Sequence, residues 1–320
     1  HDTAAILDNK IINGPSFQER YTQGSDFKIY NSEAKNNIVL KIGTPRVLRK
    51  LNGVVLSLLT GGAGNNNYWH WLYDVLPRIG LCSKSFNLND INYYLLPSLI
   101  KKFQNETLDV LKIPKSKRLS SSKYRHIKTK KLIITDHPVV VSGNSTLDIQ
   151  NIPKWIMLWL KKNLIKENII KNKKVNNKIY IERDFVSKNK ISERSISNDE
   201  EVKNYLLDKG FDVVRLGKLD FQDQVNLFYN AKHIIGLHGA AFANIVFCKP
   251  ETKVIEIKSL SAGSAISNLA KKNDLNYKSI DVDDKYINKH VSSTKQGQDV
   301  GFTANLEIPL NSLNEILKNK

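Results

Sequence analysis

Cysteine is scarce in this chain of 320 residues and occurs at only two positions. Cys82 and Cys248 lie far apart on apolar segments and form no CxxC pattern, so we interpret them as buried free thiols. A disulfide framework and a cysteine-based zinc site are thereby excluded. Long hydrophobic runs are absent too, since no apolar segment reaches the length needed to cross a membrane.

Several familiar signatures of enzyme sites are also missing. The chain has no GxSxG elbow, no GxxxxGK(S/T) loop, no HExxH pair and no GxGxxG turn. These absences count against a serine hydrolase, a P-loop enzyme, a zinc protease and a simple dinucleotide-binding enzyme. The sequence Asp281-Val282-Asp283 offers a DxD pattern, which holds a divalent metal in some transferases. Because it ends a late predicted strand beside a poorly patterned loop, we expect no metal there.

Acidic residues are outnumbered by basic ones, 31 against 49, which gives a net charge of +18. Much of the excess is local: residues 112–131 carry nine Lys or Arg and no acid, and residues 154–178 carry eight with Glu167 alone. Neither run is interleaved with the aromatic residues of a nucleic-acid platform, so we expect no nucleic-acid partner. Two interpretations stay open for these runs: solvated faces, or contact with a membrane surface or an anionic acceptor.

The length suits two domains, and the polar run 171–178 is the best candidate for their boundary. After this run strands and helices alternate with short connections, which predicts a parallel doubly wound sheet. Before it, the Asn52-Gly53 pair within the apolar segment 47–59 predicts a hairpin. Asn198 is expected to cap the helix that follows it. The predicted strands are 27–30, 38–42, 92–96, 126–135, 179–182, 212–216, 233–237, 253–257 and 277–282. One predicted helix begins near 68. The others span 97–111, 152–170, 198–209, 221–231, 241–247, 265–272 and 311–318.

Three ionisable residues share one face of the helix that begins near Tyr68. His70, Asp74 and Arg78 follow one another at intervals of four residues, on a helix otherwise rich in Trp and Leu. An imidazole beside a carboxylate can hold and release a proton near neutral pH, which suits a general base. The alternative is an ordinary ion pair on a helix surface.

A second candidate site lies in the later half of the chain. The strand 233–237 breaks at a Gly-His-Gly turn around His238 and leads into a helix, whose free N–H groups suit a phosphate. Arg183 follows the strand 179–182 directly, and arginine suits bidentate phosphate contacts. Glu256, on the next strand, has the position of an acid that accepts hydrogen bonds from a ribose. The alternative is a tight turn with a buried histidine.

Together these segments resemble glycosyltransferase family 61. The first shared motif, in residues 67–78, is similar to the family's aromatic-His-Trp-Leu-x-Asp-x-Leu-Pro-Arg. The second is a strand ending in Arg183, followed by Arg194 ahead of an Asn-Asp-Glu sequence, and the third runs from Ala231 to Ile257. Leu237 replaces a usual Pro, and the stretch between the two arginines is longer than usual.

The resemblance implies an α/β protein of GT-B-like architecture, with two Rossmann-like domains facing across a cleft. We expect an N-terminal acceptor-side domain (1–170), a C-terminal nucleotide-sugar-binding domain (171–290), and a tail helix (291–320) packing back on the N-terminal domain. The implied activity is inverting, metal-independent transfer of a sugar from a nucleotide-sugar, UDP-linked in the family, to a hydroxyl of a glycan acceptor. Synthesis of a surface or capsular polysaccharide is the expected role. The alternative is a non-catalytic protein that binds polyanions or glycans through its basic surface.

The resemblance also assigns residues. Asp74 or His70 would be the base. Asp74 is narrowly favoured because it is fully ionised at pH 7, although a neutral His70 is the better proton acceptor, and the sequence leaves the choice open. The expected donor contacts are Arg183, Arg194, His238, Gly239, Ala240, Asn244 and Glu256. The expected acceptor or cleft residues are Asn67, Trp69 and Arg78. No cofactor or metal is expected, because the nucleotide-sugar is a substrate. We expect a cytoplasmic protein whose acceptor is a glycan, with an anionic or lipid-linked acceptor and peripheral membrane contact as open alternatives.

Overall fold

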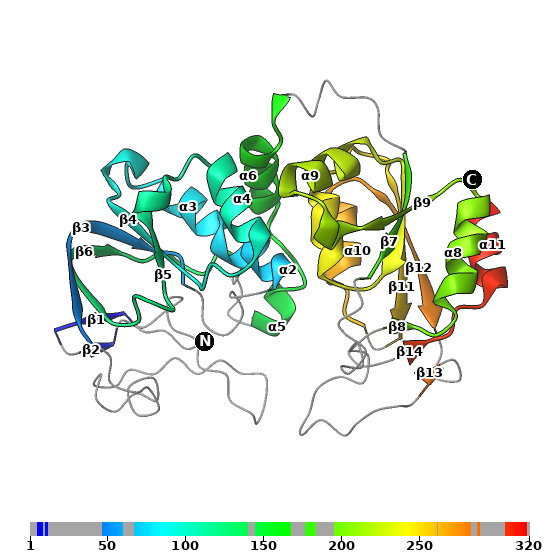
Figure 1. Cartoon of the computed structure of the whole chain (residues 1–320), viewed down its shortest axis with the longest axis horizontal. Helices are drawn as coiled ribbons and strands as arrows, with labels where there is room; N and C mark the ends of the chain where they lie inside the picture. The colour runs from blue at the N-terminus through cyan, green and yellow to red at the C-terminus, as the bar shows by residue number, and fades with distance from the viewer. Residues whose placement is uncertain are drawn as a thin grey trace. The chain divides into compact units, whose positions relative to one another are not determined.

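The computed structural model describes residues 5–8, 10–11, 47–59, 67–139, 145–167, 177–183, 195–260, 262–282, 287–288 and 305–318. The chain divides into two compact units, His1–Leu164 and Ile165–Lys320, called unit 1 and unit 2 below. The main sheet of each unit is wholly parallel, which confirms the predicted α/β class (Figure 1). Among the described residues, no helix is long and apolar enough to span a membrane. The predicted strands 27–30 and 38–42 lie outside the described residues.

Unit 1 is built on a four-stranded sheet in the order β5-β4-β3-β6. The chain runs from β3 through β4 to β5 on one side and then crosses to β6 on the other. The direction of winding therefore reverses between β3 and β6, and in such sheets ligands bind at the carboxyl ends of the strands beside the reversal. The strands are β3 (Arg49–Ser57), β4 (Tyr93–Leu96), β5 (Arg118–Ser120) and β6 (Ile127–Ile133), with a separate antiparallel pair β1 (Ile6–Leu7) and β2 (Lys10–Ile11). The helices are α2 (Tyr68–His70), η2 (Trp71–Val75), α3 (Pro77–Cys82), η3 (Leu88–Asp90), α4 (Lys102–Val110), η4 (Lys115–Lys117), α5 (Ser145–Asp148) and α6 (Lys154–Leu164).

The hairpin predicted at Asn52-Gly53 is wrong, because this segment is one continuous strand, β3. Gly53 has a φ of 104°, and pairing with β6 shifts between Leu51 and Val54, where β3 holds one extra residue. The Val54 N–H donates to Oδ1 of Asn92, 2.7 Å away, which satisfies a donor at the irregularity. The Asn-Gly pair therefore makes a β-bulge instead of a turn.

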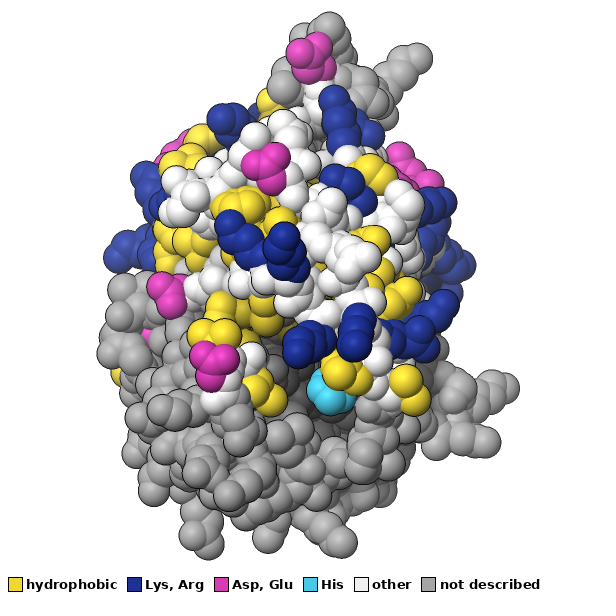
Figure 2. Space-filling model, turned by 90° about the vertical axis from the view of Figure 1, so that its left-hand side faces the viewer, with side chains coloured by type: hydrophobic (Ala, Val, Ile, Leu, Met, Phe, Trp, Pro, Cys, Tyr) yellow, Lys and Arg dark blue, Asp and Glu magenta, His cyan; other side chains and the backbone are white. Residues whose placement is uncertain are grey.

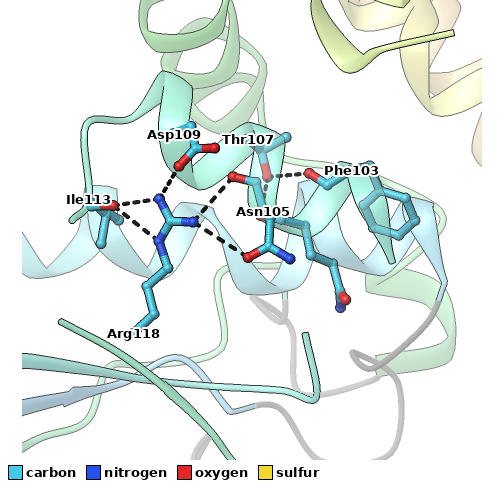
Figure 3. Close-up of polar contacts among 7 residues, drawn as sticks. Phe103, Asn105, Thr107, Asp109, Ile113 and Arg118 are labelled. Atoms are coloured by element: carbon cyan, nitrogen blue, oxygen red, sulfur yellow. Dashed lines mark hydrogen bonds and ion pairs between the residues drawn. The ribbon is translucent and has the colours of Figure 1, made fainter. Parts of the chain in front are cut away.

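Arg118, in the basic run 112–131, has a structural role. The guanidinium of Arg118, 3% exposed, lies against the C-terminal end of α4 (Figure 3). It donates to the carbonyl oxygen of Ile113 (3.0 Å from Nε) and to Oδ1 of Asp109 (2.5 Å from Nη2), and also contacts Asn105. Carbonyl groups at and beyond a helix C-terminus lack partners within the helix, so a cation that binds them joins α4 to β5.

Unit 2 is built on a five-stranded parallel sheet in the order β12-β11-β10-β7-β9. The central strands β7, β10 and β11 are buried along nearly their whole length, as expected for a sheet covered on both faces. Helices α8 and α11 cover one face, and α9 and α10 lie on the other (Figure 1). The strands are β7 (Lys178–Glu182), β9 (Asp212–Arg215), β10 (His233–Leu237), β11 (Lys253–Ser259) and β12 (Asn276–Val282), with a small sheet of β8 (Ser195–Ile196), β13 (Ile287–Asn288) and β14 (Asn305–Leu306). The helices are α8 (Asp199–Asp208), η5 (Leu216–Lys218), α9 (Phe221–Asn230), η6 (Ala240–Phe247), α10 (Ala265–Lys272) and α11 (Leu310–Lys318).

The last helix is part of the core of unit 2. Leu313 of α11 is fully buried against residues of α8 and the sheet, and Oη of Tyr205 in α8 donates to Oδ1 of Asn314. Asn198 makes no side-chain cap to α8; its amide instead donates to the carbonyl oxygen of Ile308 and accepts from the Ile308 N–H, both at 2.9 Å. Asn198 is therefore the N-cap residue of α8, as predicted, but its side chain binds the backbone of Ile308 instead of a backbone N–H of the helix. The contacts of α11 described here lie within unit 2, and packing of the tail on the N-terminal domain stays a prediction.

Candidate active site

The helix that follows β3 changes from α-helical to π-helical hydrogen bonding within the first motif, residues 67–78. Asn67 caps α2, since its Oδ1 accepts from the Trp69 N–H at 2.9 Å. From Trp71 the chain forms a π-helical turn, closed by a bond of 3.1 Å from the Leu76 N–H to the Trp71 carbonyl, and α3 begins at Pro77. Proline has no N–H to continue the α-helical pattern, and single π-turns occur often at functional sites.

His70 and Asp74 form a hydrogen-bonded pair across this turn. Nδ1 of His70 lies 2.5 Å from Oδ2 of Asp74, and the two side chains are 18% and 1% exposed. Burial opposes ionisation of Asp74, but the hydrogen bond and charge of His70, with the charges of His137 and Arg78, outweigh it and lower its pKa. An ionised carboxylate can only accept, so Nδ1 of His70 donates and Nε2 is the nitrogen left to take a proton.

Arg78 lies behind this pair, almost fully buried. Its Nε donates to the carbonyl oxygen of Asp74 at 3.1 Å, and its Nη1 to the carbonyl oxygen of Thr135 at 3.3 Å. Burial lowers the pKa of Arg78 to about 10, against the opposing charges of Asp74 and Asp136, so it stays cationic at neutral pH. Among the described residues, Nη2 of Arg78 and Oδ1 of Asp74 are buried without a hydrogen-bond partner. Such buried polar atoms are rare and concentrate where a protein has a chemical task.

His137 belongs to the same cluster and was missed in the sequence. It is buried, and its Nδ1 accepts from the Val139 N–H at 3.3 Å. Burial lowers its pKa to about 4, with Asp74 opposing the shift, so the imidazole is neutral at pH 7. The signal that could have found it is topological: Thr135 and His137 follow the carboxyl end of β6, the strand beside β3 at the reversal of winding.

The second candidate site lies at the matching position of unit 2. The sheet reverses its winding between β7 and β10, and Arg183 and His238 follow the carboxyl ends of these two strands. Nδ1 of His238 contacts Oε1 of Glu256, whose Oε2 accepts from Oη of Tyr277 at 2.5 Å. Burial, with the nearby charge of Glu256, raises the pKa of Tyr277, so its hydroxyl stays protonated and can donate. Glu256 is fully buried, whereas His238 is 16% exposed and Tyr277 is half-buried, so these two members of the group can meet a ligand.

The other predicted site residues differ in their burial and in their contacts. Ala240 begins the 3₁₀-helix η6 directly after Gly239, and both are half-buried. Asn244 is fully buried and donates to Oε1 of Gln224 at 3.1 Å. Trp69 packs on the ring of Tyr73. Arg183 is exposed, and Arg194 lies outside the described residues. The roles predicted for all these residues stay predictions.

A charged network lies beside Arg183. Glu182, the last residue of β7, is buried and accepts from Nη2 of Arg215 (2.9 Å) and from Nζ of Lys203 (2.6 Å). Nζ of Lys203 also lies 2.6 Å from Oδ2 of Asp199, on the same helix. The hydrogen bond from Arg215, helped by Lys203, lowers the pKa of Glu182 to about 2 against the effect of burial. This network anchors the end of the strand from which Arg183 emerges.

Within the described parts of the chain, no group of three or more His, Cys, Asp or Glu is arranged to hold a metal ion. Of the DxD pattern, Asp281 lies on β12 with Nζ of Lys258 3.8 Å away, and Asp283 lies outside the described residues. Both cysteines are free and buried, as predicted.

The family described as Glycosyltransferase 61 matches residues 68–255, which include His70, Asp74, Arg78 and His137 of the first cluster and His238 of the second; Glu256 and Tyr277 follow the matched segment. A search of the curated proteins finds no relative of the chain.

Proposed function

This chain belongs to glycosyltransferase family 61, and we propose that it transfers a sugar, with inversion, from a nucleotide-sugar to a hydroxyl of a glycan acceptor without a metal ion. A UDP-linked donor and a role in surface or capsular polysaccharide synthesis are part of this proposal and rest on the family resemblance. So does the GT-B architecture, in which unit 1 serves the acceptor and unit 2 the donor. The observation that carries the mechanism is the hydrogen bond between His70 and the buried Asp74.

In the proposed reaction His70 is the general base. Nε2 of His70 takes the proton of the acceptor hydroxyl, whose oxygen bonds to the anomeric carbon as the bond from that carbon to the diphosphate breaks. Asp74 holds the imidazole by Nδ1 and stabilises the imidazolium that forms. We favour His70 over Asp74 as the base because Asp74 is 1% exposed and its lowered pKa makes it the weaker proton acceptor.

The diphosphate already carries two negative charges and gains a third when its bond to the anomeric carbon breaks, so these charges need partners. We propose that Arg183, His238 and the first N–H groups of η6, at Gly239 and Ala240, supply them in place of a divalent cation. Glu256 then orients His238 through Nδ1, which is a more specific task than holding the ribose, because both of its oxygens already accept from protein groups. Arg194 stays a proposed donor contact, and Asn244, within η6, holds this helix against α9 through its hydrogen bond to Gln224.

Donor binding is tested by the thermal unfolding of the full chain with a panel of nucleoside diphosphates and nucleotide-sugars, each with and without EDTA. A ligand at 100 times its Kd stabilises a protein by about 2.7 kcal/mol, which a melting curve resolves. We expect stabilisation by one nucleoside diphosphate that survives chelation and is lost in Arg183→Ala. Stabilisation only in the presence of a divalent cation would overturn metal independence. No stabilisation by any nucleotide would overturn the donor site.

The base is tested by turnover of the donor so identified. His70→Gln should lower kcat by 10²- to 10⁴-fold, the usual contribution of a general base, while donor binding is unchanged. His126→Gln is the matched control, because His126 is an exposed histidine of the same unit. Full activity in His70→Gln would refute the assignment.

A further inference from the structure

Three exposed lysines lie on one face of strands β3 and β6, at an edge of the sheet of unit 1: Lys50 and Lys128 are register partners, and Lys130 lies two residues beyond Lys128. Figure 2 looks at the side of the molecule where these strands lie and shows Lys and Arg side chains next to exposed hydrophobic ones. We call this group the basic face. Its members are Lys50, Lys128 and Lys130.

The basic face does not serve the stability of the sheet. Lys50 and Lys128 are direct register partners on neighbouring strands, and like charges placed opposite each other are destabilising. No Asp or Glu occurs in residues 112–131 to offset them. In the same run Arg118 and Lys117 differ, because both donate to backbone carbonyl groups inside unit 1. The residues of the basic face thus create a positive field directed at solvent.

Apolar side chains are exposed beside these charges. Val47 and Leu48, directly before β3, are 84% and 42% exposed, and Leu132 on β6 is 37% exposed. A polar polyanion has no apolar surface against which these side chains could be buried. At a lipid surface, however, the lysines meet anionic headgroups while the apolar side chains enter the boundary of the acyl region. Charge and apolar exposure together therefore favour a lipid surface over a soluble polyanion.

We propose that the basic face binds the surface of a membrane rich in anionic lipid. The contact is peripheral and electrostatic at first encounter, so salt weakens it. It is independent of the transfer chemistry proposed above, and either can fail without the other.

The test is co-sedimentation of the full chain with two kinds of vesicle: phosphatidylcholine alone, and equal parts of phosphatidylcholine and phosphatidylglycerol. A triple variant replaces Lys50, Lys128 and Lys130 by Gln. Each lysine near an anionic surface contributes about 1 kcal/mol, so the triple should weaken binding to the anionic vesicles on the order of 100-fold. The control triple replaces Lys218, Lys232 and Lys249 of unit 2, which are also exposed, and should change binding only slightly. Equal losses in the two triples, or equal binding to both kinds of vesicle, would overturn the proposal.

A second variant separates a lipid surface from a soluble polyanion. Replacing Val47 and Leu48 by Ser removes apolar area without changing charge, so it should weaken binding to anionic vesicles about tenfold and leave binding to soluble heparin unchanged. Leu207→Ser is the control, because Leu207 is exposed in unit 2. If the Ser variant binds vesicles like the wild type, the surface recognises anions in general and the lipid proposal fails.

Discussion

Removal of Lys203 should destabilise unit 2 and leave unit 1 unchanged. Lys203 is 9% exposed, and its Nζ lies within 3 Å of carboxylate oxygens of Glu182, Asp199 and Glu200. Lys203→Met removes the positive charge that pairs with the carboxylates of Glu182 and Asp199. Both carboxylates are largely buried, so water cannot replace the lost ion pair. Losing one partner of a buried ion pair costs about 3–5 kcal/mol.

The expected loss lies at the lower end of that range, about 3 kcal/mol, because two partners remain. Arg215 still donates to Glu182, and Oη of Tyr180 still donates to Asp199 at 3.0 Å. The matched control is Lys102→Met, which also removes a helix lysine from a pair with an acid four residues away. Lys102 is 62% exposed and its Nζ lies 3.5 Å from Glu106, so this change should cost less than about 0.5 kcal/mol.

The assay uses the placement of the tryptophans. All four, at positions 69, 71, 155 and 159, belong to unit 1, so tryptophan fluorescence follows the unfolding of that unit alone. Far-UV circular dichroism follows both units. In urea, Lys203→Met should lower the midpoint of a dichroism transition while the fluorescence transition stays in place. A loss below about 1 kcal/mol, or a common shift of both transitions, would refute the reasoning.

Other predictions concern single buried groups. His137 has a folded-state pKa of about 4, below its usual value, so the unfolded chain binds more protons between pH 6.5 and 4. The stability of unit 1, followed by tryptophan fluorescence, should therefore fall by on the order of 3 kcal/mol as the pH falls through that window, and His137→Asn should flatten the fall. Thr107→Val leaves Nε1 of Trp71 without its acceptor at 2.8 Å and should cost about 1–3 kcal/mol in urea unfolding, whereas Thr107→Ser should cost less. Glu256→Gln removes the carboxylate behind His238 and should weaken nucleotide binding, measured by calorimetry, about 10- to 100-fold; an unchanged Kd would count against the positioning role.

The fold is most predictable where the signal is local. The sequence predicts β10 at 233–237 and α10 at 265–272, and the structure has the same bounds, because periodicity and flanking turns define such elements. The bulge at Gly53 could not be predicted in this way. Its geometry depends on Asn92 and on pairing with β6, which lie far along the chain, and a local Asn-Gly signal carries no information about them.

The candidate site, too, contains contacts that follow from the local sequence and contacts that depend on distant segments. The contact between His70 and Asp74 follows from helical spacing, and the structure has it. His137 joins them only because β6 lies beside β3, which is a fact of strand order. The surroundings of Glu256 depend on Tyr277 from the neighbouring strand, so its contacts with Tyr277 and His238 could not be predicted from the local sequence.

The place of α11 affects how the protein is made on the ribosome. Unit 1 is contiguous in sequence, so its sheet and helices can assemble while the rest of the chain is still being synthesised. Unit 2 cannot complete its fold until its last residues have been synthesised. Leu313 fills part of its core, and Ile308 provides hydrogen bonds to Asn198, which lies more than a hundred residues earlier. Until α11 has been made, the face of the sheet that α11 shares with α8 stays partly uncovered, and some of its hydrophobic residues are exposed. During synthesis, unit 2 is therefore the part of the nascent chain that most needs protection by a chaperone.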